Sequence, residues 1–150
     1  MDCLRGSRIN QIEIADDFYG AYEHCFCPHE GQIRAIPGFV NGLFAAELYF
    51  KLLLGEKAET LKGCRGHNLL FLYNLLESSA KSSLGSVAAT GGHKLEELLK
   101  IIGDGFIAWR YIFEGKKKKF GGKWPFEYTE AFLDCYLPKL KEMAHEKMGH

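Results

Sequence analysis

Neither sign of charge is in excess in this sequence of 150 residues. Lysine plus arginine and aspartate plus glutamate each number 19, so the formal net charge is zero. A chain with this balance does not bind nucleic acids or membranes through bulk charge, and any such binding must be local. An uncharged apolar run of the roughly 18 residues needed for a membrane span is also missing. The first 18 residues lack the apolar stretch of a secretory signal. We therefore expect a cytoplasmic protein without a membrane contact.

The cysteines do not form the pattern of a disulfide framework. Their number is odd, and they are scattered through the chain at Cys3, Cys25, Cys27, Cys64 and Cys135. This usage fits a reducing compartment. Zinc sites that are recognisable from sequence combine two halves of the form C-x2-4-C or H-x3-5-H. The chain has a short cluster of possible ligands, with a C-x-x-H pair further on: His24, Cys25, Cys27, His29, Cys64 and His67. These residues do not supply two such halves. We expect no metal and no other cofactor.

Familiar enzyme signatures are missing too. The chain has no glycine-rich phosphate loop, no nucleophile elbow and no HExxH motif. What the sequence does contain is core material, since 47% of its residues are hydrophobic and 13% are aromatic. This composition is too apolar for a disordered chain. Its length suits a single domain spanning residues 1–150.

Residues 36–54, IPGFVNGLFAAELYFKLLL, form the most apolar part of the chain. Apolar side chains fall at every angle around a helix drawn through them, which is typical of a helix buried on nearly all sides. Pro37 suits a first helical turn, and Gly55 follows the last apolar residue, where a C-terminal glycine is expected. The sequence therefore predicts a central helix here.

Further helical periodicity flanks this segment. It predicts helices at residues 10–26, beginning with an Asn10–Glu13 capping box, at 67–78, at 93–115 and at 129–148, where Pro138 should introduce a kink. Residues 78–92 are small and aperiodic, which predicts a loop. Alternating β-branched runs and internal repeats are both missing. The prediction is an all-α, up-and-down bundle of four to five helices.

Glu47 and Lys51 are the charged residues of the central segment, and they stand one turn apart. Their edge of the helix either touches solvent or faces a polar site shared with another helix. His67 follows a glycine at the start of the next predicted helix. It is either a capping or solvent-facing residue or a general acid or base.

Positive residues near the end of the 93–115 segment are the other candidates. Arg110 lies among aromatic residues, where it either covers apolar surface or offers its five donors to a phosphate or carboxylate. Four lysines follow it closely: Lys116, Lys117, Lys118 and Lys119. They are either a solvated loop or a contact for phosphates, with the rings of Phe120 and Trp124 available for base stacking.

Three segments, in order, carry a family resemblance: FVNGLFAAELYFKLLL, GHNLLFLYNLL and DGFIAWRYIFE, together covering about residues 40–114. They resemble small bacterial members of the HEPN superfamily (higher eukaryotes and prokaryotes nucleotide-binding). The resemblance implies a HEPN-like helical bundle that commonly forms homodimers. It also implies activities that range from metal-independent endoribonuclease toxins to catalytically silent partners that bind RNA or nucleotides.

The chain departs from the catalytic pattern of this family. Active members carry an arginine followed after four to six residues by a histidine, and Arg110 matches the arginine. Gly115, Lys116 and Lys117 occupy the histidine positions. Without a nearby imidazole, the 2′-hydroxyl of RNA has no evident base. His67 could supply one if the fold brings it beside Arg110, with Glu47 and Lys51 completing the cluster.

Two hypotheses follow. In the first, a HEPN-like protein of a bacterial defence or toxin–antitoxin system binds RNA or a nucleotide through Arg110, His67, Glu47, Lys51 and the four lysines, with or without weak cleavage. In the second, the chain is a non-catalytic protein–protein interaction module, an antitoxin-like partner whose polar cluster is structural.

Overall fold

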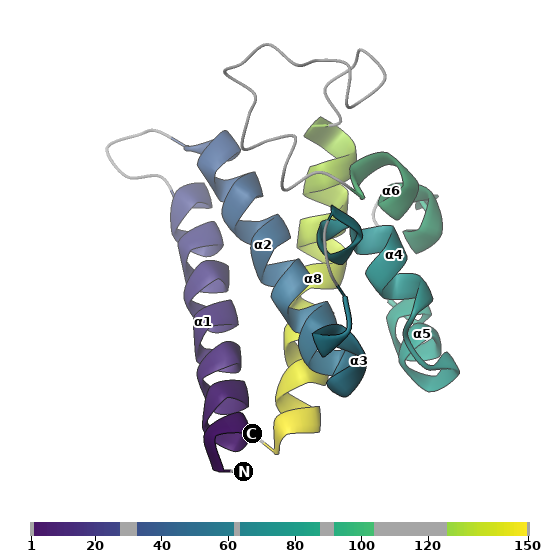
Figure 1. Ribbon diagram of the computed structural model, residues 1–150. Helices are drawn as coiled ribbons and strands as arrows, with labels where there is room; N and C mark the ends of the chain where they lie inside the picture. Colours follow the sequence, from purple (N-terminus) through teal and green to yellow (C-terminus); the bar gives the residue numbers. More distant parts are fainter. Residues whose placement is uncertain (1, 28–32, 62–63, 88–91, 104–125, 150) are drawn as a thin grey trace.

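The computed structural model describes residues 2–27, 33–61, 64–87, 92–103 and 126–149, and every regular element in these ranges is a helix (Figure 1). The all-α prediction is confirmed. The elements are α1 (Asp2–Phe26), α2 (Ala35–Leu54), α3 (Glu56–Glu59), the 3₁₀ turn η1 (Cys64–His67), α4 (Leu69–Asn74), α5 (Ser78–Gly85), α6 (Leu95–Ile102) and α8 (Phe126–Met148).

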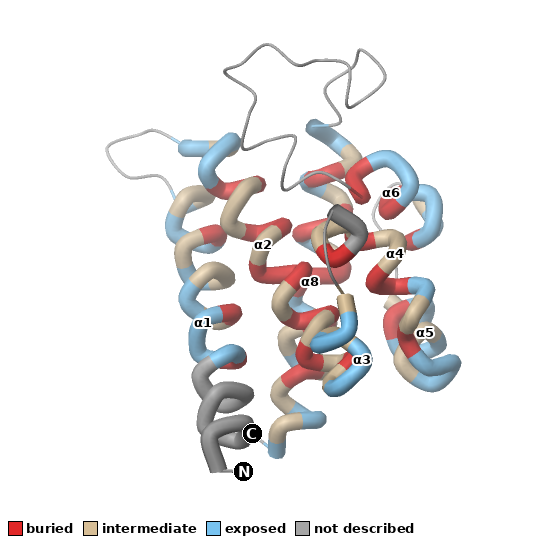
Figure 2. The backbone as a smooth tube through the Cα atoms, in the orientation of Figure 1, coloured by how far each residue is buried: buried red, intermediate tan, exposed pale blue. Residues whose placement is uncertain are grey.

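Helix α2 is the centre of the bundle. It lies between α1 and α8, and α4 and α6 pack on the other side of this three-helix group (Figure 1). Helix α2 is buried over most of its surface and keeps one partly exposed row, whereas α1 is buried along one side (Figure 2). Phe39, Leu43 and Phe50 of α2 are fully buried. Burying side chains of this size contributes about 1.5–3 kcal/mol each, so α2 contributes much of the core.

The predicted bounds of the central helix are confirmed. Helix α2 begins at Ala35, which places Pro37 in the first turn, and it ends at Leu54. Gly55 then adopts a φ of 61°, a conformation that favours glycine, and its N–H donates to the carbonyl of Lys51. Within α2, a Cβ on Gly42 would lie 2.8 Å from Leu133 Cδ1, so the glycine allows α8 to approach closely.

Two local predictions are wrong. Helix α1 begins at Asp2, so Asn10 lies inside the helix and does not cap it. Asparagine in a helix interior is only mildly unfavourable, and the capping-box pattern therefore did not mark a helix start. Residues 78–85 form helix α5 rather than a loop. Leu84 of α5 is fully buried, and its packing decides the conformation of a segment with little periodicity of its own.

The remaining predicted helices are present with shifted bounds. The helix predicted at residues 67–78 is α4, which follows a 3₁₀ turn. That predicted at 93–115 is represented by α6, and its continuation from residue 104 lies outside the described residues. Helix α8 begins at Phe126 and includes Pro138. Among the described residues, no helix combines the length and apolarity that crossing a bilayer requires.

Candidate functional site

Glu47 is a buried carboxylate in the middle of α2. Its side chain is 1% exposed. In the described part of the chain, Glu47 and Thr129 are the two buried polar residues. An ionised group removed from water is costly unless it is paired and hydrogen-bonded. The surroundings of Glu47 must therefore supply partners for both carboxylate oxygens.

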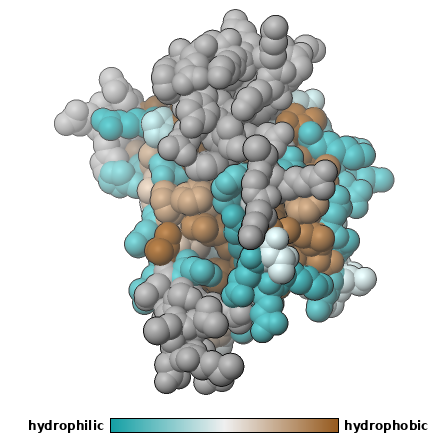
Figure 3. Space-filling view, viewed as in Figure 1, coloured by the Kyte–Doolittle hydropathy of each residue, from teal (hydrophilic) through white to brown (hydrophobic). Residues whose placement is uncertain are grey.

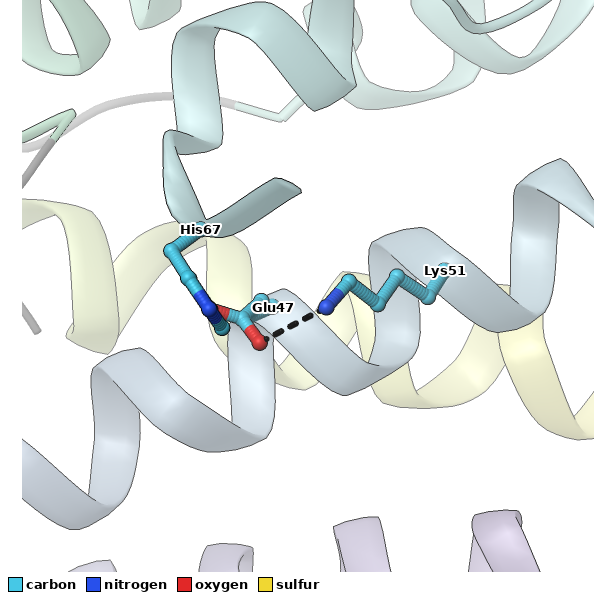
Figure 4. Close-up of polar contacts among 3 residues, drawn as sticks. All are labelled: Glu47, Lys51 and His67. Atoms are coloured by element: carbon cyan, nitrogen blue, oxygen red, sulfur yellow. Dashed lines mark hydrogen bonds and ion pairs between the residues drawn. The ribbon is translucent and has the colours of Figure 1, made fainter. Parts of the chain in front are cut away.

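Lys51 and His67 are these partners (Figure 4). Lys51 Nζ lies 3.0 Å from Glu47 Oε2, one turn along the same helix. His67 Nδ1 lies 2.9 Å from Glu47 Oε1 and comes from η1. The side chains of Lys51 and His67 are 28% and 44% exposed. The result is a buried carboxylate that holds two nitrogen-bearing side chains at the surface.

The backbone around His67 is fixed by the start of α4. Asn68 is the N-cap residue of that helix, and its Oδ1 accepts a hydrogen bond of 2.9 Å from the N–H of Phe71. The N–H of Leu69 donates to the carbonyl of Gly103 at 2.9 Å. A Cβ at position 103 would lie 3.0 Å from Asn68 Nδ2. The glycine at this position therefore lets the end of α6 lie close to Asn68. His67 is thus placed by the residues next to it.

The structure brings together three of the residues proposed from the sequence. The edge of α2 that carries Glu47 faces a polar cluster shared with another element, as one of the two sequence-based alternatives predicted. Arg110 and the four lysines, Lys116, Lys117, Lys118 and Lys119, lie outside the described residues. The roles of all these side chains in ligand binding stay predictions.

A second polar cluster, which the sequence analysis missed, joins α1, α2 and α8. The hydroxyl of Tyr49 donates to Asp16 Oδ1 at 2.5 Å, and His145 Nε2 lies 2.8 Å from Asp16 Oδ2. Burial, followed by the hydrogen bond to Asp16, raises the pKa of Tyr49 above its ordinary value of 10.0. The signal in the sequence for this cluster was the position of Tyr49 on a helix predicted to be buried, because a buried tyrosine hydroxyl usually has a hydrogen-bond partner.

A hollow of the described surface lies elsewhere. A cleft of about 710 Å³ beside α6 also involves residues of α4, α5 and α8. Two lysines and two glutamates line it together with a histidine and two tyrosines: Tyr73, His93, Lys94, Glu96, Glu97, Lys100 and Tyr136. Because these charges balance, the cleft offers no electrostatic preference for an anion. The cluster of Glu47, Lys51 and His67 does not line it, and we regard that cluster as the stronger candidate site.

A metal centre has no support in the described part of the molecule. No three histidine, cysteine, aspartate or glutamate side chains gather there in a way that could hold an ion. His29 of the sequence cluster lies outside the described residues.

Comparisons of the chain with protein-family models, with curated proteins and with solved structures found no match. The resemblance to the HEPN superfamily therefore rests on its three sequence segments.

Proposed function

We propose that this protein binds RNA or a nucleotide through a surface centred on Glu47, Lys51 and His67. The observation that carries the proposal is the buried carboxylate of Glu47, which holds the ammonium of Lys51 and the imidazole of His67 in one small area of surface. An ammonium and an imidazole are suitable partners for the phosphate and hydroxyl groups of a nucleotide.

The three clustered side chains carry too little charge to bind a polyanion alone. Glu47 and Lys51 neutralise one another, so the cluster is at most singly positive, when His67 is protonated. The proposal therefore includes Arg110 and the lysines Lys116, Lys117, Lys118 and Lys119, which precede α8 in the sequence. Their role would be to contact phosphates, with the clustered side chains reading the sugar.

Cleavage of RNA is a separate matter from binding. The histidine that follows the arginine in catalytic HEPN proteins is missing, and His67 is the alternative imidazole. We therefore propose a protein that binds RNA, with weak ribonuclease activity at most.

The first experiment measures binding of a fluorescent single-stranded RNA at several salt concentrations. We expect affinity to fall with salt, because binding releases counterions from the RNA. Arg110→Ala and Lys51→Ala should weaken binding, and neutralising the four lysines should reduce the slope of log K against log salt by about 0.7 for each lost phosphate contact. Absence of binding at low salt, or binding unaffected by these variants, would contradict the proposal.

Incubation with a mixed RNA pool then separates an enzyme from a binding protein. Cleavage by the parent that Arg110→Ala and His67→Ala both abolish would establish a ribonuclease. Intact RNA beside measurable binding would place the protein in the catalytically silent class.

A second candidate function is protein interaction, and an apolar area favours it. The α1–α2 stripe consists of Ile14 and Phe18 on α1 and Val40, Phe44 and Leu48 on α2. Ile14 is 47% exposed and the other four are partly buried. The rings of Phe18 and Phe44 join the two rows, with centroids 4.4 Å apart. Figure 3 shows apolar surface over these two helices.

The occupant that we propose for this stripe is a second copy of the chain. The stripe runs along α2 to Leu48, next to Lys51, so a homodimer formed there would place the polar cluster of each copy at the edge of the interface. An antitoxin-like protein partner is the alternative occupant.

A further inference from the structure

His67 is attached to the protein interior through one of its two ring nitrogens. Nδ1 lies 2.9 Å from the buried Oε1 of Glu47. Nε2 lies on the opposite side of the ring, the side chain is 44% exposed, and within the described part of the chain Nε2 has no hydrogen bond or ion pair. One nitrogen is therefore engaged, and the other is available to a ligand.

The partners of Glu47 decide which nitrogen carries the proton. Lys51 has only donors to offer, so Glu47 Oε2 accepts from Nζ at 3.0 Å. An ionised carboxylate has no proton to donate and accepts at both oxygens. Nδ1 of His67 must therefore donate to Oε1. In the neutral imidazole this leaves a lone pair on Nε2.

Lys51 adds a second available group. An ammonium has three N–H donors, and one of them is directed to Glu47. Because Lys51 and His67 bind the same carboxylate, their unused groups share one area of surface. An acceptor on an imidazole and donors on an ammonium suit a ligand in which a hydroxyl stands next to an anionic group. A ribose carrying a phosphate has this combination, and the 2′-hydroxyl is what distinguishes RNA from DNA.

We propose that Glu47 is a positioning residue that holds His67 in the Nδ1–H tautomer, so that Nε2 accepts a hydrogen bond from a ribose hydroxyl while Lys51 contacts the neighbouring phosphate. The inference rests on the proposed binding of RNA or a nucleotide and deepens it, because it identifies the group on the ligand that His67 recognises.

The tautomer is tested by ¹⁵N NMR of the full-length parent protein with labelled histidine. We expect the proton of neutral His67 on Nδ1. His145 is an internal control, because it meets Asp16 through Nε2 and should carry its proton there. In Glu47→Gln, whose amide can both donate and accept, the preference of His67 for one tautomer should be lost, and the His145 signal should not change. An Nε2–H signal for His67 in the parent would overturn the inference.

The hydroxyl contact is tested with an RNA oligonucleotide and the DNA oligonucleotide of the same sequence. We expect the parent to bind RNA about three- to tenfold more tightly, the effect of one hydrogen bond. Glu47→Gln and His67→Phe should bring the ratio close to one, whereas the control Asp16→Asn should keep the parent ratio. Circular dichroism would confirm that each variant is folded.

The outcomes separate the two proposals. If neither oligonucleotide binds, the proposed function fails, and with it the hydroxyl contact. If both bind equally to the parent, or if the preference survives in both cluster variants, nucleic-acid binding stands and the role given to Glu47 and His67 is wrong.

Discussion

Glu47 shows how a single side chain can shape the interior of this protein. Its carboxylate is inaccessible to solvent, and its two partners come from different distances along the chain. Within the described residues, no buried side-chain nitrogen or oxygen is left without a hydrogen-bond partner. The buried charge is therefore tolerated because both of its oxygens are bound.

Lys51 should matter more for stability than a surface lysine of equal exposure. Lys51→Met leaves Glu47 buried with one partner fewer, and we expect the free energy of unfolding to fall by about 1–3 kcal/mol. Lys139 is a matched control, because it is also 28% exposed but pairs with Glu142, which is 57% exposed. Lys139→Met should change stability by no more than about 0.5 kcal/mol. Urea titration measures both values, and equal effects would contradict this account.

At the level of helices, α1 is attached to its two neighbours in different ways. It packs closely against α2, while its smaller contact with α8 includes a row of polar interactions. Tyr22 donates to Asp134 at 2.9 Å, Lys141 Nζ lies 4.4 Å from the centre of the Tyr19 ring, and Asp16 pairs with His145. These contacts follow one another along the two antiparallel helices. The polar contacts of α1 with α8 and, through Asp16, with Tyr49 of α2 should therefore respond to pH.

Two tyrosines predict the direction of that response. Burial, followed by the hydrogen bond to an aspartate, raises the pKa of both Tyr22 and Tyr49 above the ordinary 10.0. In the unfolded chain these phenols ionise near pH 10, whereas in the folded protein they stay protonated to higher pH. Their contribution to stability is therefore complete below about pH 10 and is lost as the pH rises further.

The measurement is the free energy of unfolding between about pH 8 and 11. The parent should lose stability steeply at the alkaline end, and the double variant Tyr22→Phe/Tyr49→Phe should lose less over the same interval. At neutral pH the variant should be less stable by about 1 kcal/mol for each lost hydrogen bond. Parallel alkaline curves for the two proteins would show that these tyrosines do not cause the loss.

At the level of the whole molecule, the bundle leaves apolar surface on one face. The α1–α2 stripe is next to the polar cluster, and we have proposed that a second copy of the chain covers it. Most of its side chains also pack inward, so Ile14, at 47% exposure, is the position where a change disturbs the core least.

Sedimentation of the parent and of Ile14→Glu tests self-association. We expect a dimer for the parent and a dimer dissociation constant at least about tenfold higher for Ile14→Glu, because the interface would bury an unpaired charge. Ile101→Glu is the control, since Ile101 is 40% exposed on α6, away from the stripe. A monomeric parent, or an equal effect of both changes, would exclude this surface as the dimer interface.

The features that depend on residues close together in the sequence could be predicted from the sequence. Helix α2 was predicted within one residue because its apolar side chains, Pro37 and Gly55 act locally. The pair of Glu47 and Lys51 follows from their spacing of one helical turn. By contrast, the start of α1 and the existence of α5 were missed. In α5 the local preference is weak, and the burial of Leu84 against the rest of the bundle decides.

The amino-acid sequence by itself determined an all-α protein around one apolar helix, with a charged pair on the edge of that helix, because periodicity and i,i+4 spacing are properties of the local chain. Only the tertiary structure decided that His67 completes the pair and that Asp16 meets His145, 129 residues away. No local pattern encodes such contacts. They arise where the fold brings distant segments together and a carboxylate that is partly or fully removed from water takes the nearest donors.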